Sequence, residues 1–106
     1  MKMYRGIRTE SGCVVTVIEE GVERSLDLRH DLRNHSPDGA NWGYGGSGPA
    51  QLSLALVADA TGDDELAQRT YQAFKRRVVA GFEGDRWELG DDFIRQIVAA
   101  IDFVED

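Results

Sequence analysis

The sequence has few of the residues that build covalent, metal or redox sites: of its 106 residues, one is cysteine and two are histidine. A single thiol forms no internal disulfide and offers no cysteine cluster to a metal. Cys13 lies in an apolar run with Val14 and Val15, which is typical of a small buried thiol. His30 and His35 stand five positions apart in a polar stretch, which is weak support for a metal site. We therefore predict neither a metal nor a cofactor.

The sequence also lacks a long apolar segment. Its first ten residues, MKMYRGIRTE, contain no apolar run of the kind that a secretory signal carries. No stretch approaches the roughly 20 apolar residues that a membrane-spanning helix needs. We expect a cytoplasmic protein that makes no membrane contact.

Basic residues are in deficit, with 12 lysines and arginines against 19 aspartates and glutamates and a net charge of −7. Because phosphate binding usually shows as a basic surplus, we expect no direct nucleic-acid binding. The deficit is local, since residues 81–106 hold eight acidic and two basic residues. These acids form either a solvated face with helix caps or a surface that steers the chain to a basic groove of a partner protein. The candidate residues for such a partner-binding surface are Glu83, Asp85, Glu88, Asp92 and Asp102.

The first quarter of the chain predicts a three-stranded antiparallel meander. Residues 3–8 and 13–18 read as strands, and β-branched side chains are dense in the second of them. After a tight turn at Glu20-Gly21, apolar and polar residues alternate from Val22 to Leu28, as in a half-exposed strand. A sheet this small needs a cover to be stable.

The centre of the chain has no charged side chain from Asn41 to Ala58. A glycine-rich loop leads into a segment that is apolar on nearly every face, and a helix of that kind belongs in the interior. Pro49 fits the first helical position with Gly48 as N-cap, and Gln51 is then placed to reach back to the cap backbone. We expect the rest of the chain to pack around this buried helix.

Two further helices are predicted after the central one. Asp63 or Asp64 caps the first and Asp91 caps the second, and both helices have an apolar stripe at helical spacing. Between them, residues 86–89 are expected to be short and extended. The prediction is a single α+β domain over residues 1–106, an N-terminal three-stranded meander followed by three helices packed around the buried central helix.

The loop that precedes the buried helix, within residues 34–51, is a candidate site for a small ligand or nucleotide. Helix N-termini bind anions through free N–H groups and the helix dipole. The loop lacks the lysine and hydroxyl residue of a P-loop and the strand–loop–helix spacing of a dinucleotide fingerprint. The alternative is a structural loop whose aromatic residues pack on the helices. The residues of interest are Asn34, His35, Trp42, Tyr44 and Ser47.

A hydrolase built on His35 is a third hypothesis, with Ser47 as the nucleophile and Asp31 or Asp38 orienting the ring. Ser47 does not lie in a G-x-S-x-G elbow, because proline follows it at the second position. The run Asn34-His35-Ser36-Pro37 is more typical of a hydrogen-bonded loop anchor. We therefore assign no catalytic residue and expect the protein not to be an enzyme.

Several runs of the sequence occur together in a recognisable pattern. The longest is WGYGGSGPAQL, from Trp42 to Leu52, and the others are Tyr4-Arg5-Gly6, residues 28–39 and residues 71–75. Together they resemble a family of small uncharacterised proteins of bacteria, phages, plasmids and other mobile elements. The resemblance covers roughly Tyr4 to Asp102 and implies no enzymatic activity, cofactor or catalytic residue.

Small acidic proteins of mobile elements are similar in character to phage counter-defence proteins, including anti-CRISPR inhibitors. We therefore expect a non-enzymatic protein-binding module of mobile-element origin. Its partner would be a host protein complex such as a CRISPR–Cas effector, which it would inhibit by occlusion. Ligand binding by the 34–51 loop and hydrolysis at His35 remain the alternatives.

Overall fold

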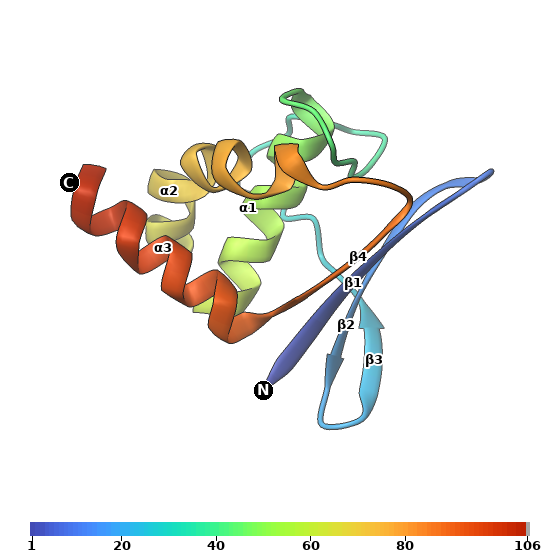
Figure 1. The fold of residues 1–106 in the computed structure, drawn as a ribbon, viewed down its shortest axis with the longest axis horizontal. Coiled ribbons are helices and arrows are strands. Elements are labelled where there is room, and N and C mark those ends of the chain that lie inside the picture. Colours follow the sequence, from blue (N-terminus) through green and yellow to red (C-terminus); the bar gives the residue numbers. More distant parts are fainter. Residues whose placement is uncertain (106) are drawn as a thin grey trace.

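The computed structural model describes residues 1–105, and side chains through residue 104. Four strands form one antiparallel sheet in the order β3-β2-β1-β4, and the helices lie on one side of it (Figure 1). The elements in chain order are β1 (Lys2–Thr9), β2 (Gly12–Glu19), β3 (Val22–Ser25), α1 (Ser47–Thr61), α2 (Asp64–Arg77), the 3-10 helix η1 (Val79–Gly81), β4 (Arg86–Gly90) and α3 (Asp91–Glu105). The predicted α+β class with three long helices is confirmed.

The strands have one buried face and one open face, because side chains alternate along each strand. Tyr4 of β1 is opposite Val17 of β2, and both side chains are fully buried beneath the helices. One position further along, Arg5 is opposite Glu88 of β4, and the two make an exposed ion pair of 3.1 Å on the other face. The helices thus cover a single face of the sheet.

The expected number of strands was wrong. Residues 86–90 form a fourth strand, β4, which pairs antiparallel with β1 from Met3↔Gly90 to Ile7↔Arg86. Its partner, β1, lies at the opposite end of the sequence, so no turn motif between neighbouring strands predicts this pairing. The third strand is also shorter than expected, since β3 ends at Ser25 and Leu26 turns into the core.

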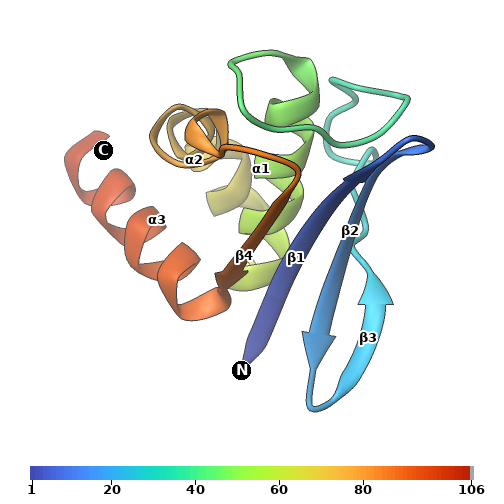
Figure 2. The same cartoon turned by 45° about the vertical axis from the view of Figure 1, so that its right-hand side comes forward.

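Helix α1 is the buried centre of the fold, as the sequence predicted. Every residue from Gly48 to Ala58 is buried, and α1 packs against both other helices (Figure 2). The helix begins earlier than expected, with Gly46 as its N-cap. It ends at Gly62, whose left-handed backbone lets its N–H donate to the carbonyl of Ala58 at 2.9 Å.

The cap predicted for α2 is present, whereas Asp91, which was expected to cap the last helix, is the first residue inside α3. The carboxylate of Asp63 accepts the N–H of Leu66 at 3.0 Å and so caps α2. The polypeptide leaves α2 after Arg77 and passes through η1 before it enters β4. Asp91 starts α3 and pairs with Arg95 one turn later at 3.0 Å.

Candidate functional site

The loop between β3 and α1 is fixed by the side chain of Gln51. This amide is fully buried, and its Oε1 accepts the backbone N–H groups of His35 at 2.8 Å and Ser36 at 3.2 Å. Its Nε2 donates to the carbonyls of Leu28 at 2.6 Å and Arg33 at 3.0 Å. The expected contact of Gln51 with the helix cap was wrong: the residue lies deeper in the helix, and its four hydrogen bonds hold the loop instead.

His35 lies against α2. Its Nε2 is 2.6 Å from the hydroxyl of Tyr71, and the two rings are tilted with centroids 5.5 Å apart. Its neighbour Asn34 is exposed. With its backbone N–H on Gln51 and its ring on Tyr71, His35 ties the loop to both α1 and α2, as a loop anchor does.

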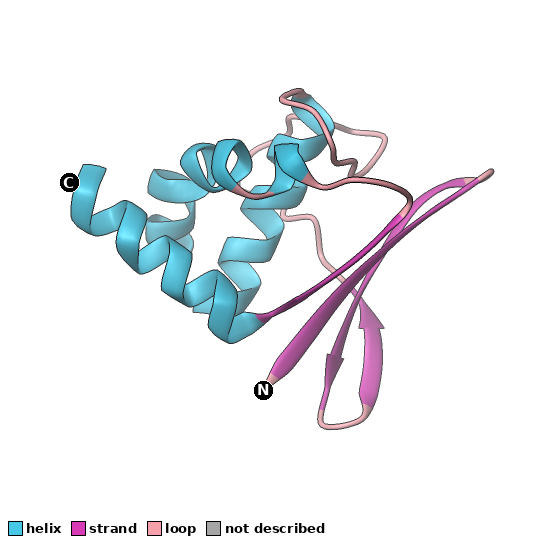
Figure 3. Cartoon of the chain, viewed as in Figure 1, coloured by secondary structure: helices cyan, strands magenta, loops and turns pink. Residues whose placement is uncertain are grey.

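Trp42 joins this loop to the segment before β4, and the two loops lie at the same end of the molecule (Figure 3). Its indole is almost fully buried and donates to the carbonyl of Gly84 at 3.0 Å. Arg8 lies over the ring with its guanidinium carbon 4.7 Å from the centroid, and it donates to Asn41 at 2.7 Å and to the carbonyl of Trp42 at 3.1 Å. Trp42 and Arg8 therefore bind three chain segments together.

Tyr44 and Ser47 line a cavity of about 250 Å³ between the β1–β2 hairpin and the N-terminus of α1. The N-cap of α1, Gly46, has no side chain to accept the first N–H groups of the helix, and Ser47 and Gly48 of the first turn lie on the cavity wall. Cys13 is also on the wall and is only partly buried, in contrast to the expected buried thiol. Its Sγ donates to Oδ1 of Asn41 at 3.6 Å.

A second, larger hollow of about 610 Å³ is lined by charged side chains whose proximity was not predicted from the sequence. At its floor, Asp59 of α1 accepts the hydroxyl of Tyr4 at 2.7 Å, Nη2 of Arg24 at 3.0 Å and Nζ of Lys2 at 3.2 Å. Burial alone would raise the pKa of Asp59, but these donors outweigh it and hold the pKa below its ordinary value. Burial first, and then the hydrogen bond to Asp59, raise the pKa of Tyr4.

The opposite wall of this hollow is held by Arg29, whose φ of 57° lies in the left-handed region. Its two terminal nitrogens each donate to the carboxylate of Asp64 at 2.8 Å, and its Nε donates to Asp31 at 3.0 Å. Hydrogen bonds from Arg29 hold the pKa of both aspartates below the ordinary value. Among the described residues, no group of three or more His, Cys, Asp or Glu side chains is arranged to hold a metal ion.

The candidate acidic residues of the last quarter are spread over several elements. Asp85 pairs with Arg8 at 3.1 Å beside the β1–β2 hairpin, and Glu88 pairs with Arg5 on the open face of the sheet. Glu83 is exposed in the segment before β4. The structure does not gather these three with the two candidates on α3, and a role for any of them in partner binding stays a prediction.

The other two candidates lie on α3. Asp102 pairs with Arg69 of α2 at 3.0 Å, and Asp92 pairs with Arg95 within α3. Both ion pairs are partly exposed. These acids therefore stand at the flank and at the N-terminal end of α3.

Comparison with known proteins places the chain in a family. A model described as a family of unknown function, DUF6166, matches residues 4–100. The chain belongs to the DUF6166 family. The WGYGGSGPAQL run of this DUF6166 member is the segment that forms the loop, the cavity wall and the start of α1. No curated protein matches the chain, and no solved structure matches it.

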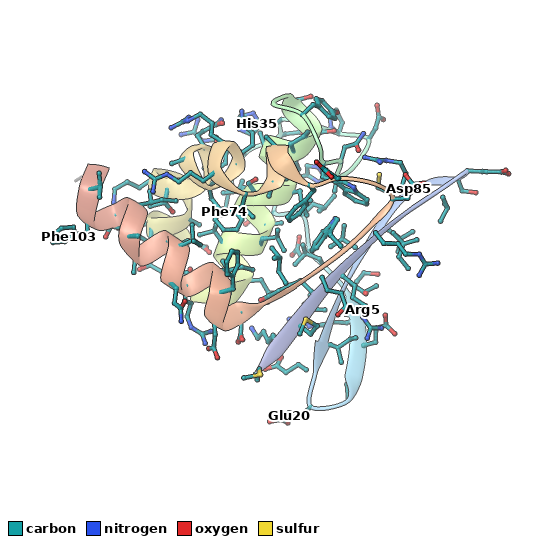
Figure 4. The ribbon with its side chains drawn as sticks, in the orientation of Figure 1. Arg5, Glu20, His35, Phe74, Asp85 and Phe103 are labelled. Atoms are coloured by element: carbon teal, nitrogen blue, oxygen red, sulfur yellow. The ribbon has the colours of Figure 1, made fainter. Side chains whose placement is uncertain are left out.

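One surface of this DUF6166 protein was not singled out in its sequence. The outward side of α3 exposes Phe93 (41%), Phe103 (87%) and Val104 (69%), and Phe103 points away from the body of the molecule (Figure 4). The remaining exposed residues of this stretch are Arg95, Gln96, Ala99 and Ala100. A sequence plot of α3 would have revealed a second apolar stripe beside the buried one. None of the described helices is long and apolar enough to cross a bilayer.

Proposed function

We propose that this protein is a non-enzymatic binding module that works by attaching to another protein. The observation that carries the proposal is the apolar outer face of α3. A helix on a protein surface usually shows polar side chains to water, and a large apolar patch marks an interaction site. Here Phe93, Phe103 and Val104 are exposed in a chain of which 29% is charged.

The class of partner that we propose is a host protein complex, with a CRISPR–Cas effector as the first to test. The small size of the chain and its net charge of −7 support this choice, because an acidic protein is attracted to a basic groove built for nucleic acid. By occluding such a groove, the protein would inhibit the host complex without catalysing a reaction. An origin in phages or other mobile elements is part of the same proposal.

The decisive experiment is a pull-down from a CRISPR-bearing host with the tagged protein as bait and the tag alone as control. Each protein that mass spectrometry identifies is then purified, and its binding is measured directly by surface plasmon resonance. We expect a nucleic-acid-binding complex whose substrate binding is blocked by the bait. A bait that retains no more than the tag alone overturns the proposal.

Charge reversal tests the steering part of the proposal. Changing Glu83, Asp85 and Glu88 to lysine is expected to slow association with the identified complex, and added salt is expected to slow the parent. The variant should fold, because the ion pairs of Asp85 and Glu88 are exposed to solvent and exposed pairs contribute little to stability. If the variant associates at the rate of the parent, these acids do not steer binding.

A second candidate function is binding of a small ligand in the cavity beside α1. The cavity is lined in part by Tyr44, Ser47 and Gly48 of the WGYGGSGPAQL run, but its volume of about 250 Å³ is below the roughly 300–1,000 Å³ of typical ligand sites. Thermal-shift measurements with inorganic phosphate and with nucleotides test this function. A shift that Ser47→Trp abolishes would favour it over the protein-binding proposal.

A further inference from the structure

Strand β4 forms one edge of the sheet, and β3 forms the other (Figure 2). The hydrogen bonds between β4 and β1 decide which backbone groups of β4 face outward. The N–H of Arg8 donates to the carbonyl of Asp85 at 2.8 Å, so Trp87, two positions further along, is hydrogen-bonded to β1 as well. The N–H and C=O groups of Arg86 and Glu88 therefore point away from the sheet.

This outward edge of β4 has no neighbouring strand. Within the part of the chain that the structure describes, no element pairs with the backbone of Arg86 or Glu88 on that side. An edge strand with free N–H and C=O groups is a template on which another strand can add. Charged side chains often protect such an edge, so the signs and positions of the charges on β4 decide what it accepts.

The two exposed side chains of this edge have opposite charges. Arg86 and Glu88 are two residues apart and share the open face of the sheet. No described residue forms an ion pair with Arg86, which is opposite Ile7 of β1. Glu88 accepts Nε of Arg5 through Oε2 at 3.1 Å, and its side chain is 57% exposed. Because a carboxylate accepts several hydrogen bonds, Glu88 can take a second cation.

We propose that the β4 strands of two copies of this chain pair antiparallel about a two-fold axis and join the two sheets into one. In the register centred on Trp87, Arg86 of each copy lies opposite Glu88 of the other. The outward N–H and C=O groups of both residues are then bonded across the axis, and their side chains form two ion pairs on the open face. Such an isologous contact closes at the dimer. This self-association is independent of the partner protein proposed above.

The charges select this register over its neighbours. If the strands slide in one direction, Arg86 lies opposite Arg86 of the second copy, and if they slide in the other, Glu88 lies opposite Glu88. Like charges directly opposite each other destabilise a strand pair, whereas unlike charges stabilise it. Only the register centred on Trp87 gains an ion pair at both positions.

The other edge of the sheet offers no such match. The N–H of Leu26 donates to the carbonyl of Val15 at 3.0 Å, so by the same alternation Glu23 and Ser25 face outward from β3. Two β3 edges would place Glu23 opposite Ser25 or opposite Glu23 of the second copy, and neither arrangement contains an ion pair. The structure therefore favours β4 as the edge that pairs.

Two further features bear on the strength of the dimer. Because β4 leads directly into α3, antiparallel pairing places the α3 helices of the two copies at opposite ends of the shared strands. The net charge of −7 on each copy opposes association, but salt screens this repulsion beyond about 8 Å at physiological ionic strength, whereas the ion pairs form at contact. We expect a weak dimer, as is usual for a small interface.

The test uses charge reversals at this edge in the full chain. Arg86→Glu and Glu88→Arg each replace both ion pairs of the homodimer with pairs of like charge. In an equimolar mixture of the two variants, the heterodimer again has unlike charges at both positions. Glu23→Arg is the matched control, because Glu23 is an exposed acid on the other edge strand. Sedimentation velocity measures the oligomeric state up to about 100 µM, between the micromolar and millimolar dissociation constants of weak complexes.

We expect the parent and Glu23→Arg to dimerise alike. Each variant at the β4 edge should have a dissociation constant roughly tenfold higher, and the mixture should regain the affinity of the parent. The substituted side chains are exposed, so the melting temperatures of the variants should lie close to that of the parent.

Amide hydrogen exchange tests the contact without any substitution. In the dimer the N–H groups of Arg86 and Glu88 are hydrogen-bonded across the two-fold axis, so their exchange should slow as the protein concentration rises. The N–H of Glu23, on the other edge, serves as the reference and should exchange at a constant rate.

A parent that remains monomeric at about 100 µM overturns the inference. A dimer that neither edge variant weakens also overturns it and assigns self-association to another surface. Species that grow beyond a dimer would indicate a heterologous, open-ended contact instead. A mixture that associates no better than its two components, or an exchange rate at Arg86 and Glu88 that does not depend on concentration, would likewise contradict the proposed register.

Discussion

Gly6 of β1 and Trp87 of β4 lie opposite each other in the sheet, and the indole of Trp87 covers the Cα of Gly6. A Cβ at position 6 would overlap three atoms of the ring. The ring in turn packs edge-on against Trp42 and stacks on Phe82. The absence of a side chain at Gly6 therefore makes room for the aromatic cluster that attaches the last strand to the first.

Gly6→Ala is expected to destabilise the protein by roughly 1–3 kcal/mol, because the indole must move to admit the methyl group. Urea unfolding of Gly6→Ala, Trp87→Leu and the double variant measures the coupling between the two positions. Gly90→Ala is the control, since a Cβ there meets no atom within 4 Å. Additive effects of the two substitutions would show that the close approach is unimportant.

Gln51→Leu is expected to lower the free energy of unfolding by roughly 3 kcal/mol or more. The substitution leaves two backbone N–H groups and two carbonyls of the loop without their partner, and each such buried group costs about 1–3 kcal/mol. Gln96→Leu, on the exposed side of α3, makes the same change where little is lost. Thermal denaturation of both variants provides the comparison, and equal melting temperatures would contradict the role of Gln51.

Leu56→Ala is expected to cost about 2–5 kcal/mol, as do other truncations of buried aliphatic side chains. Leu56 is fully buried in α1, which packs against both other helices. The urea midpoint of the variant measures this cost. A midpoint close to that of the parent would mean that α1 is not the centre of the core.

Asp59 should make stability depend on acidic pH. Its pKa is lower in the folded chain than its ordinary value, so the unfolded chain binds a proton first as the pH falls. The stabilisation is then complete at neutral pH and is lost as the pH falls below about 4 and through the folded pKa. Asp59→Asn should be less stable than the parent at pH 7 and approach it towards pH 2. A constant gap between the two unfolding curves would show that Asp59 acts through packing alone.

The parts of the fold that the sequence revealed are those with a local signal. The uncharged stretch up to Ala58 indicated a buried helix, and Asp63 and Asp91 indicated where two helices begin. Residues 86–89 were expected to be extended, but their place in the sheet was not predicted, because this strand pairs with β1 at the other end of the chain. Pairing between distant segments depends on tertiary contacts that strand propensity does not contain.

The sequence indicated which loop forms the candidate site, but not which side chains hold that loop in place. Residues 34–51 were identified as the segment of interest, but Gln51, the residue that organises it, was assigned a contact with the helix cap. Asp59 carried no signal at all, because its three donors come from β1 and β3. The exposed apolar side of α3 was legible in the sequence, since Phe93, Ala100 and Phe103 recur at helical spacing.

The pairing of β4 with β1 also sets the order in which the molecule can be made. Strand β1 is synthesised well before its partner β4, and α3 follows later still. Until then the nascent chain exposes one edge of β1 and the side of α1 that α3 covers. Contacts between such distant segments slow folding, and exposed edges invite association with other chains. During translation, the open edge of β1 and the uncovered side of α1 therefore favour association with other chains until β4 and α3 have been made.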